Sequence, residues 1–230
     1  MKRYIFLIAM LFVITSFKTS SVSFYAKPKL YPEIEKFYAS LPTSPTEESK
    51  KIPLHDLYSV LVSGISSDNA VNIVFTCSDN SFRSVAAQVI LQSLVSVNKY
   101  NKIVVFSTGN QSAEINTTLL KILAKHGFIA TEQTNNVNGK KSYEIKFGDN
   151  VQSFPIYSKQ VSEAGLPKNI FMQMKLCSVN ETICTDLPLA KFKETISYND
   201  TKTISSEDEL DKEFTAIATD ILWAFNQTKQ

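Results

Sequence analysis

Short apolar runs that alternate with helical patterns are the feature that most restricts the fold of this chain. Four such runs are rich in β-branched and aromatic side chains or alternate in polarity, and we expect them to be strands: residues 72–76, 103–106, 170–176 and 194–198. Helical patterns follow the first two, at about 85–95 and 113–126. This alternation predicts a three-layer α/β fold, with a mainly parallel central sheet of about four strands and helices on both faces.

Other sequence patterns predict elements before, between and after these strands and helices. Residues 30–41 and 57–65 repeat apolar side chains at helical spacing, so residues 27–68 are predicted to be a helical preamble to a domain formed by residues 69–230. Ser206 and Glu209 form a capping-box pattern that begins a long C-terminal helix. Residues 143–147 alternate like a half-exposed strand, which we expect to pair with residues 129–134 across Asn138-Gly139.

The first 26 residues have the composition of an export signal. Lys2 and Arg3 precede an apolar run at residues 4–14, and no acidic residue occurs before Glu33. The run is shorter than the ~20 residues of a membrane-spanning helix. We therefore predict a signal peptide over residues 1–26, or an N-terminal anchor if it is retained, and an exported protein, periplasmic or secreted. Cleavage would leave no stable membrane span.

Charge and composition exclude several functions. The chain has 230 residues and a net charge of +2 without a basic block, so nucleic acid is not expected as a partner. Its two histidines, His55 and His126, lack neighbours at metal-ligand spacing, and we expect neither a metal nor a cofactor. Removal of residues 1–26 would take away three of the 24 basic residues and none of the 22 acidic ones. The charge would become −1, and Arg83 would be the only arginine left.

The turn after the first predicted strand carries the chemistry. In parallel sheets, ligands bind beyond the carboxyl ends of the strands. The segment there is Cys77-Ser78-Asp79-Asn80-Ser81-Phe82-Arg83-Ser84. Backbone N–H groups of a turn that leads into a helix bind anions, and a thiol placed there is stabilised as thiolate.

These residue types define a candidate site for a tetrahedral oxyanion. A guanidinium on the same loop can hold two oxygens of the anion in fork geometry, and Ser81 or Ser84 can hydrogen bond to the sulfur. We predict Cys77 as nucleophile and residues 78–84, including Arg83, as the oxyanion-binding loop. The alternative is a buried cysteine at a strand end with an unrelated arginine.

This segment resembles the phosphate loop of low-molecular-weight protein tyrosine phosphatases and of the related thioredoxin-coupled arsenate reductases, which both use Cys-x5-Arg-Ser after the first strand. The resemblance extends over most of residues 28–228, with further matches at residues 30–36, 106–109 and 216–222 and at Asn116. It implies a phosphatase-I-like fold and an enzyme that acts on arsenate or phosphate, with Asn116 as a supporting residue. The general acid of the family corresponds here to Asp200, although Thr201 stands where the family usually has proline.

The resemblance also gives the other two cysteines a role. Cys177 and Cys184 occupy the positions that form a redox relay with the loop cysteine in the arsenate reductases, where a thioredoxin-like protein is the final reductant. The alternative is a structural disulfide in an exported protein. Our favoured hypothesis is an arsenate reductase that uses Cys77, Cys177 and Cys184. A phosphatase that hydrolyses a phosphorylated substrate through Cys77, Arg83 and Asp200 is the first alternative, and a non-catalytic oxyanion-binding protein is the second.

Overall fold

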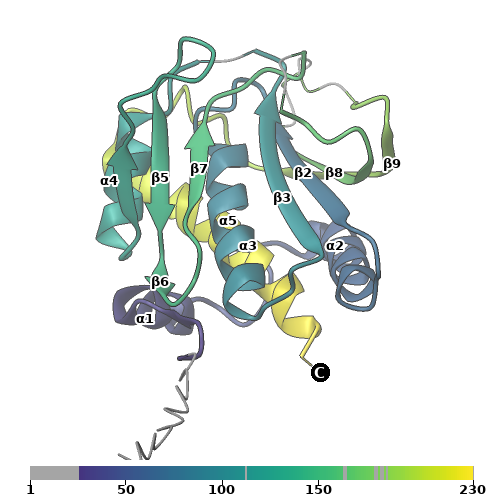
Figure 1. Ribbon diagram of the computed structural model, residues 1–230. Coiled ribbons are helices and arrows are strands. Elements are labelled where there is room, and N and C mark those ends of the chain that lie inside the picture. The colour runs from purple at the N-terminus through teal and green to yellow at the C-terminus, as the bar shows by residue number, and fades with distance from the viewer. Residues whose placement is uncertain are drawn as a thin grey trace, which may run out of the picture.

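A four-stranded parallel sheet forms the centre of the protein. The computed structural model describes residues 26–111, 113–162, 165–178, 181, 184 and 186–229, and the predicted signal peptide lies outside them except for Ala26. The strands run in the order β3-β2-β8-β9, and each neighbouring pair is parallel (Figure 1). Their bounds are β2 (Val71–Cys77), β3 (Ile103–Gly109), β8 (Ile170–Cys177) and β9 (Ala190–Ser197). The predicted α/β class and parallel sheet are confirmed.

Two helices, α2 (Lys51–Ile65) and α3 (Arg83–Val97), contact this sheet, and α5 (Glu207–Gln227) packs against both of them. Alternate residues of β2 separate its two faces, so Ile73 and Phe75 pack into the large core with these helices. On the other face Val74 packs with Leu187 and Ala190, from the connection into β9. Figure 1 shows α5 passing behind α3, and Ser206 caps its start by accepting a hydrogen bond from the Glu209 N–H at 3.4 Å, as the capping-box pattern predicts.

The N-terminal segment belongs to the same core. Helix α1 (Pro32–Ser40) buries Ile34 and Phe37, a single 3-10 turn covers Glu48–Lys50, and α2 buries Leu54. Leu30, expected to be helical, instead lies in β1 (Lys29–Leu30), which pairs antiparallel with β6 (Gly148–Asp149). The two helices of the predicted preamble are therefore present, and their apolar faces are buried against the rest of the chain.

A second sheet fills the crossover between β3 and β8. Its strands are antiparallel, in the order β4 (Ile129–Glu132), β5 (Ser142–Lys146) and β7 (Phe154–Tyr157). The predicted hairpin across Asn138-Gly139 is confirmed, and both turn residues have positive φ. Helix α4 (Thr117–Lys125) starts later than expected, because the Asn116 side chain accepts a hydrogen bond from the Thr118 N–H and ends the preceding extended segment.

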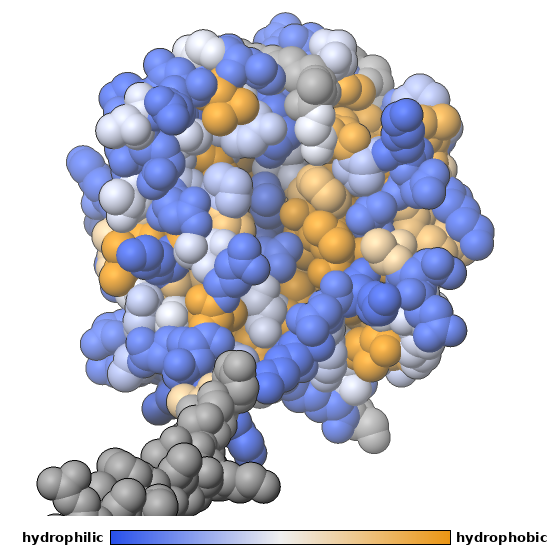
Figure 2. Space-filling view, in the orientation of Figure 1, coloured by the Kyte–Doolittle hydropathy of each residue, from blue (hydrophilic) through white to orange (hydrophobic). Residues whose placement is uncertain are grey.

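The visible surface is mostly hydrophilic. Figure 2 shows polar side chains over most of one face, with apolar side chains gathered near its middle, in the region of β3, which forms an edge of the sheet. Among the residues that the structure describes, we find no helix long and apolar enough to cross a bilayer.

Candidate active site

The predicted loop lies between the end of β2 and the start of α3, at the carboxyl edge of the sheet. Residues after β3 close the loop from one side: the N–H groups of Gln111, Ala113 and Asn116 donate to the carbonyls of Ser78, Asp79 and Ser81. Gly109 is required there, since a Cβ at that position would come within 2.6 Å of the Asn80 backbone nitrogen. The neighbouring strand thus fixes the curvature of the loop through backbone contacts.

Cys77 is a free thiol at the base of the loop, and it is 1% exposed. The Ser84 hydroxyl lies 3.0 Å from Cys77 Sγ, as the sequence predicted for one of the two serines. Asn80 donates from Nδ2 to Ser84 Oγ at 2.8 Å, which leaves the Ser84 proton free to bond the sulfur. Asn80 is itself fixed by a left-handed φ of 52° and by the Lys159 N–H, which donates to Asn80 Oδ1 at 2.8 Å. This chain of bonds orients a donor onto the predicted nucleophile.

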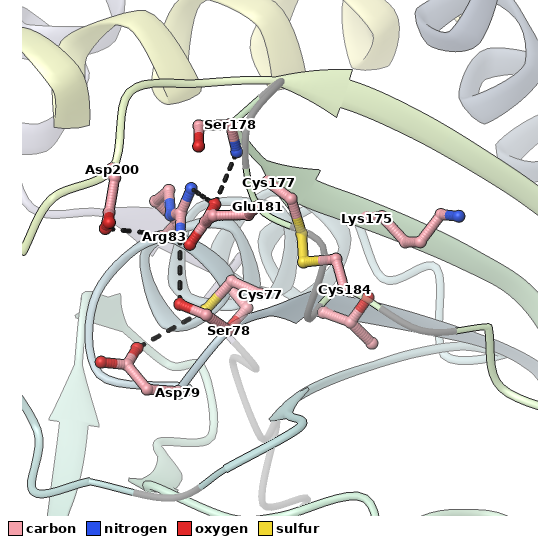
Figure 3. The surroundings of a disulfide bond; sticks show 12 residues. Cys77, Ser78, Asp79, Arg83, Lys175, Cys177, Ser178, Glu181, Cys184 and Asp200 are labelled. Atoms are coloured by element: carbon pink, nitrogen blue, oxygen red, sulfur yellow. Dashed lines mark hydrogen bonds and ion pairs between the residues drawn. A yellow bond between two sulfur atoms is a disulfide. The ribbon is translucent and has the colours of Figure 1, made fainter.

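Arg83 is fully buried and points into the same site (Figure 3). Its Nη2 donates to Ser78 Oγ at 3.3 Å and lies 3.9 Å from Asp200 Oδ1. Burial lowers the pKa of Arg83, but Glu181, Cys77 and Asp200 together raise it, so the guanidinium is firmly charged. Arg83 Nε is a buried donor without a hydrogen-bond partner in the described structure. A charged arginine with an unused N–H is suited to hold one more acceptor oxygen.

Glu181 is the principal partner of Arg83, and sequence reasoning missed it. The two carboxylate oxygens accept from Nη1 at 2.6 Å and from Nη2 at 2.7 Å, and the Ser178 N–H donates to Oε2 at 2.6 Å. Burial raises the pKa of Glu181, but the bonds from Arg83 and Ser178 outweigh it and hold the pKa at about 2. The available signal was that Glu181 is the one acidic residue between Cys177 and Cys184.

Asp200 reaches the loop from the segment after β9. Its Oδ1 accepts from the Lys202 N–H at 3.1 Å, and its side chain is 28% exposed, so it faces both Arg83 and solvent. Glu213 of α5, also missed, holds this segment: its buried carboxylate accepts from the Asn199 N–H at 2.7 Å and from Asn199 Nδ2 at 3.0 Å. This contact gives the segment a fixed conformation although proline does not follow Asp200.

Two side chains of the predicted oxyanion-binding loop make contacts within the protein. The Asp79 carboxylate turns back into the loop, where Oδ1 accepts from the Ser81 N–H at 3.1 Å and from Ser81 Oγ at 2.9 Å. The Ser81 N–H is therefore occupied by the Asp79 carboxylate. Lys202 Nζ lies 3.4 Å from Asp79 Oδ2 and offsets its charge. The Phe82 side chain packs into the hydrophobic core, so only its backbone can face an anion.

The remaining predicted residues lie around this loop. Asn116 supports it through its backbone, because its N–H donates to the Ser81 carbonyl at 3.1 Å while its side chain caps α4. Cys177, at the end of β8, forms a disulfide with Cys184 (Figure 3), and β8 pairs with β2, the strand that ends at Cys77. A disulfide between these two residues fits both a structural bridge and the oxidised end of a relay. In the described ranges, no group of three histidine, cysteine or acidic side chains is arranged to hold a metal ion.

No family model matches this chain, and no curated protein matches it. Solved structures similar to this chain include three arsenate reductases. An arsenate reductase from Archaeoglobus fulgidus is 17% identical with a TM-score of 0.41, covering 65% of this chain and 98% of that one. An arsenate reductase in its phosphate-binding state is 17% identical with a TM-score of 0.45, covering 70% and 98%. A thioredoxin-dependent arsenate reductase from Corynebacterium glutamicum is 16% identical with a TM-score of 0.41, covering 86% of each chain.

Proposed function

We propose that the protein is a cysteine-dependent arsenate reductase in which Cys77, Cys177 and Cys184 form a thiol relay. One observation carries the choice of reaction: Glu181, which lies between Cys177 and Cys184 in the sequence, contacts the anion loop directly through the paired bonds from Arg83. Cys177 also ends β8, the strand that pairs with β2, and β2 ends at the free thiol of Cys77. A hydrolytic phosphatase has no use for the second and third thiols.

The proposed reaction begins at Cys77. Its thiolate attacks the arsenic of arsenate, an oxygen leaves as water, and an S–As bond forms. Arg83 holds two oxygens of the anion, with its unpaired Nε as one donor, and the Ser84 hydroxyl stabilises the sulfur as thiolate. Asp200, near the same guanidinium, protonates the departing oxygen.

Reduction of arsenic then uses the other two thiols. The Cys177 thiolate attacks the Cys77 sulfur, and the S–As electron pair passes to arsenic, which leaves as arsenite. The resulting Cys77–Cys177 disulfide is resolved when the Cys184 thiolate attacks Cys177, which releases Cys77 as thiolate. Two thiols have then supplied two electrons, and the product is the Cys177–Cys184 disulfide, the bond that the structure contains. An external dithiol protein of the thioredoxin type restores both thiols, and for an exported chain that reductant works outside the cytoplasm.

The position of Asp200 favours a second candidate function, phosphomonoester hydrolysis. Its carboxyl group lies 3.9 Å from Arg83 Nη2, where it can protonate the leaving oxygen of an ester whose phosphate is held by the loop. Cys77 would form a cysteinyl-phosphate, and water activated by Asp200 would hydrolyse it. This reaction requires neither Cys177 nor Cys184.

Single-turnover chemistry distinguishes the two functions. The reduced, desalted chain is mixed with arsenate without added reductant, and arsenite and disulfides are quantified by mass spectrometry. Wild type should release about one arsenite per chain, since one relay supplies one electron pair, and end with Cys177–Cys184 bonded. Cys184→Ser should release the same amount but end with Cys77–Cys177 bonded, and Cys177→Ser should release none. Equal arsenite from wild type and Cys177→Ser would contradict the relay. Hydrolysis of an aryl phosphate by all three proteins, without arsenite, would support the phosphatase.

A further inference from the structure

The anion site of this protein already contains a carboxylate from its own chain. We propose that Glu181 is an internal ligand of Arg83 which an incoming oxyanion must displace, and that the Cys177–Cys184 disulfide holds it in the site. Glu181 would thereby determine when, and how tightly, the site accepts substrate. The inference rests on the proposed function only in taking Arg83 as the oxyanion clamp.

The Glu181 carboxylate makes the contacts that a bound substrate anion would make. Arg83 gives both terminal nitrogens to the two oxygens of Glu181, at 2.6 Å and 2.7 Å, and the Ser178 N–H adds a third donor at 2.6 Å. Paired N–H donors are what a guanidinium offers to one face of a tetrahedral oxyanion. Of the guanidinium nitrogens only Nε remains unpaired. A substrate that uses the fork must therefore break both bonds to Glu181.

Protonation does not release this carboxylate under ordinary assay conditions. Arg83 and Ser178 hold the pKa of Glu181 at about 2, so Glu181 stays charged wherever phosphate or arsenate is an anion. Competition for Arg83 is then between two negative groups of similar geometry. Its outcome depends on the effective concentration of Glu181 at the guanidinium, which the conformation of its segment sets.

The disulfide controls that conformation. Cys177 and Cys184 are seven residues apart, and Glu181 lies between them, with its N–H also bonded to the Ser178 carbonyl at 3.1 Å. The bond closes a short ring and restricts where Glu181 can be. Reduction opens the ring, so the carboxylate spends less time on Arg83 and the fraction of empty sites rises. The apparent dissociation constant of an oxyanion falls in inverse proportion to that fraction.

The exposure of the nucleophile agrees with a closed site. In this disulfide-bonded form Cys77 and Arg83 are each 1% exposed, and Ser78 is 2% exposed. A closed oxidised form would have a consequence for the relay. An enzyme whose Cys177 and Cys184 are oxidised cannot complete a turnover, and Glu181 would keep it from taking up another arsenate. The enzyme would then have to be reduced before it binds arsenate.

Inorganic phosphate tests the inference without any turnover. Its binding to the full chain is measured by titration calorimetry with the disulfide formed and after reduction, for wild type and Glu181→Ala. For wild type we expect reduction to tighten phosphate binding by at least about tenfold. This is the change expected if Arg83 is free of Glu181 in about a tenth or less of the oxidised molecules and in most of the reduced ones. Glu181→Ala should bind phosphate in its oxidised form as tightly as reduced wild type does. The matched control Glu207→Ala, an exposed glutamate at the start of α5, should behave as wild type.

The outcomes separate this inference from the proposed function. Equal phosphate affinity in oxidised and reduced wild type, together with an unchanged affinity in Glu181→Ala, overturns the internal-ligand proposal and leaves the anion site intact. Phosphate that binds none of these proteins in either redox state overturns the anion site itself. If Glu181→Ala does not fold, the oxidised and reduced wild-type titrations still decide: a difference below about twofold refutes the proposal.

Discussion

Replacement of Asn80 by alanine should be among the most damaging single changes in the loop. Asn80 is completely buried and has a φ of 52°, a conformation that asparagine tolerates but that costs most other L-residues about 1–2 kcal/mol. Its side chain also makes two buried bonds, from the Lys159 N–H and to Ser84 Oγ, both at 2.8 Å. Loss of the Ser84 bond costs about 1 kcal/mol, and a buried Lys159 N–H without its acceptor costs about 1–3 kcal/mol.

These terms predict that Asn80→Ala lowers the free energy of unfolding by about 3–6 kcal/mol, measured by urea denaturation of the disulfide-bonded chain. Asn80→Gly is the matched control, because glycine accepts positive φ but loses the same two bonds. It should be less destabilised than Asn80→Ala by about 1–2 kcal/mol. A cost below about 1 kcal/mol for Asn80→Ala would refute the bridging role of the side chain. Equal costs for the two variants would refute the argument from backbone conformation.

Three further predictions concern the charged groups around the site. Glu213→Gln loses one of the two bonds to Asn199, the residue before Asp200, and so displaces Asp200. Because a misplaced Asp200 impairs proton transfer, kcat for an aryl phosphate or arsenate should fall by about tenfold with little change in KM. Since the pKa of Glu181 is about 2 in the fold, below its value of 4.5 when unfolded, its stabilising contribution is present above about pH 4.5 and is lost as pH falls through 2. The difference in unfolding free energy between wild type and Glu181→Gln should thus shrink from pH 5 to pH 3, and an unchanged difference would contradict the assignment. Lys202→Ala leaves Asp79 without its cation, so phosphate binding to the reduced chain should weaken by about threefold or more at low salt. The loss should be smaller at high salt, because salt already screens the Lys202–Asp79 pair in wild type. Equal phosphate affinities of wild type and variant in calorimetry would show that the pair does not affect binding.

The sequence alone predicts the parts of this protein that depend on neighbouring residues. Short apolar runs place β2, β3 and β8, because strands buried on both faces are apolar almost throughout. A period of 3.6 places the long helix α5, because one face of that helix is buried. Ser206 and the Asn138-Gly139 turn act within a few residues, so the pattern is sufficient to identify them. Very short elements such as β1 and β6 are missed, since two residues carry no period.

The candidate site also has residues that the sequence predicts and residues that only the tertiary structure identifies. Cys77, Arg83 and Ser84 lie within one turn and one helix start, so their spacing was enough to predict that they share a site. Only the tertiary structure brings in Glu181, which bonds to Arg83 across 98 residues of chain, and Glu213, which fixes the segment of Asp200 from a separate helix. It also decides that Asp79 turns inward onto Ser81. These contacts join charged groups from segments that are distant in the sequence. Burial and packing at the edge of the sheet determine which groups pair, and no local sequence pattern contains that information.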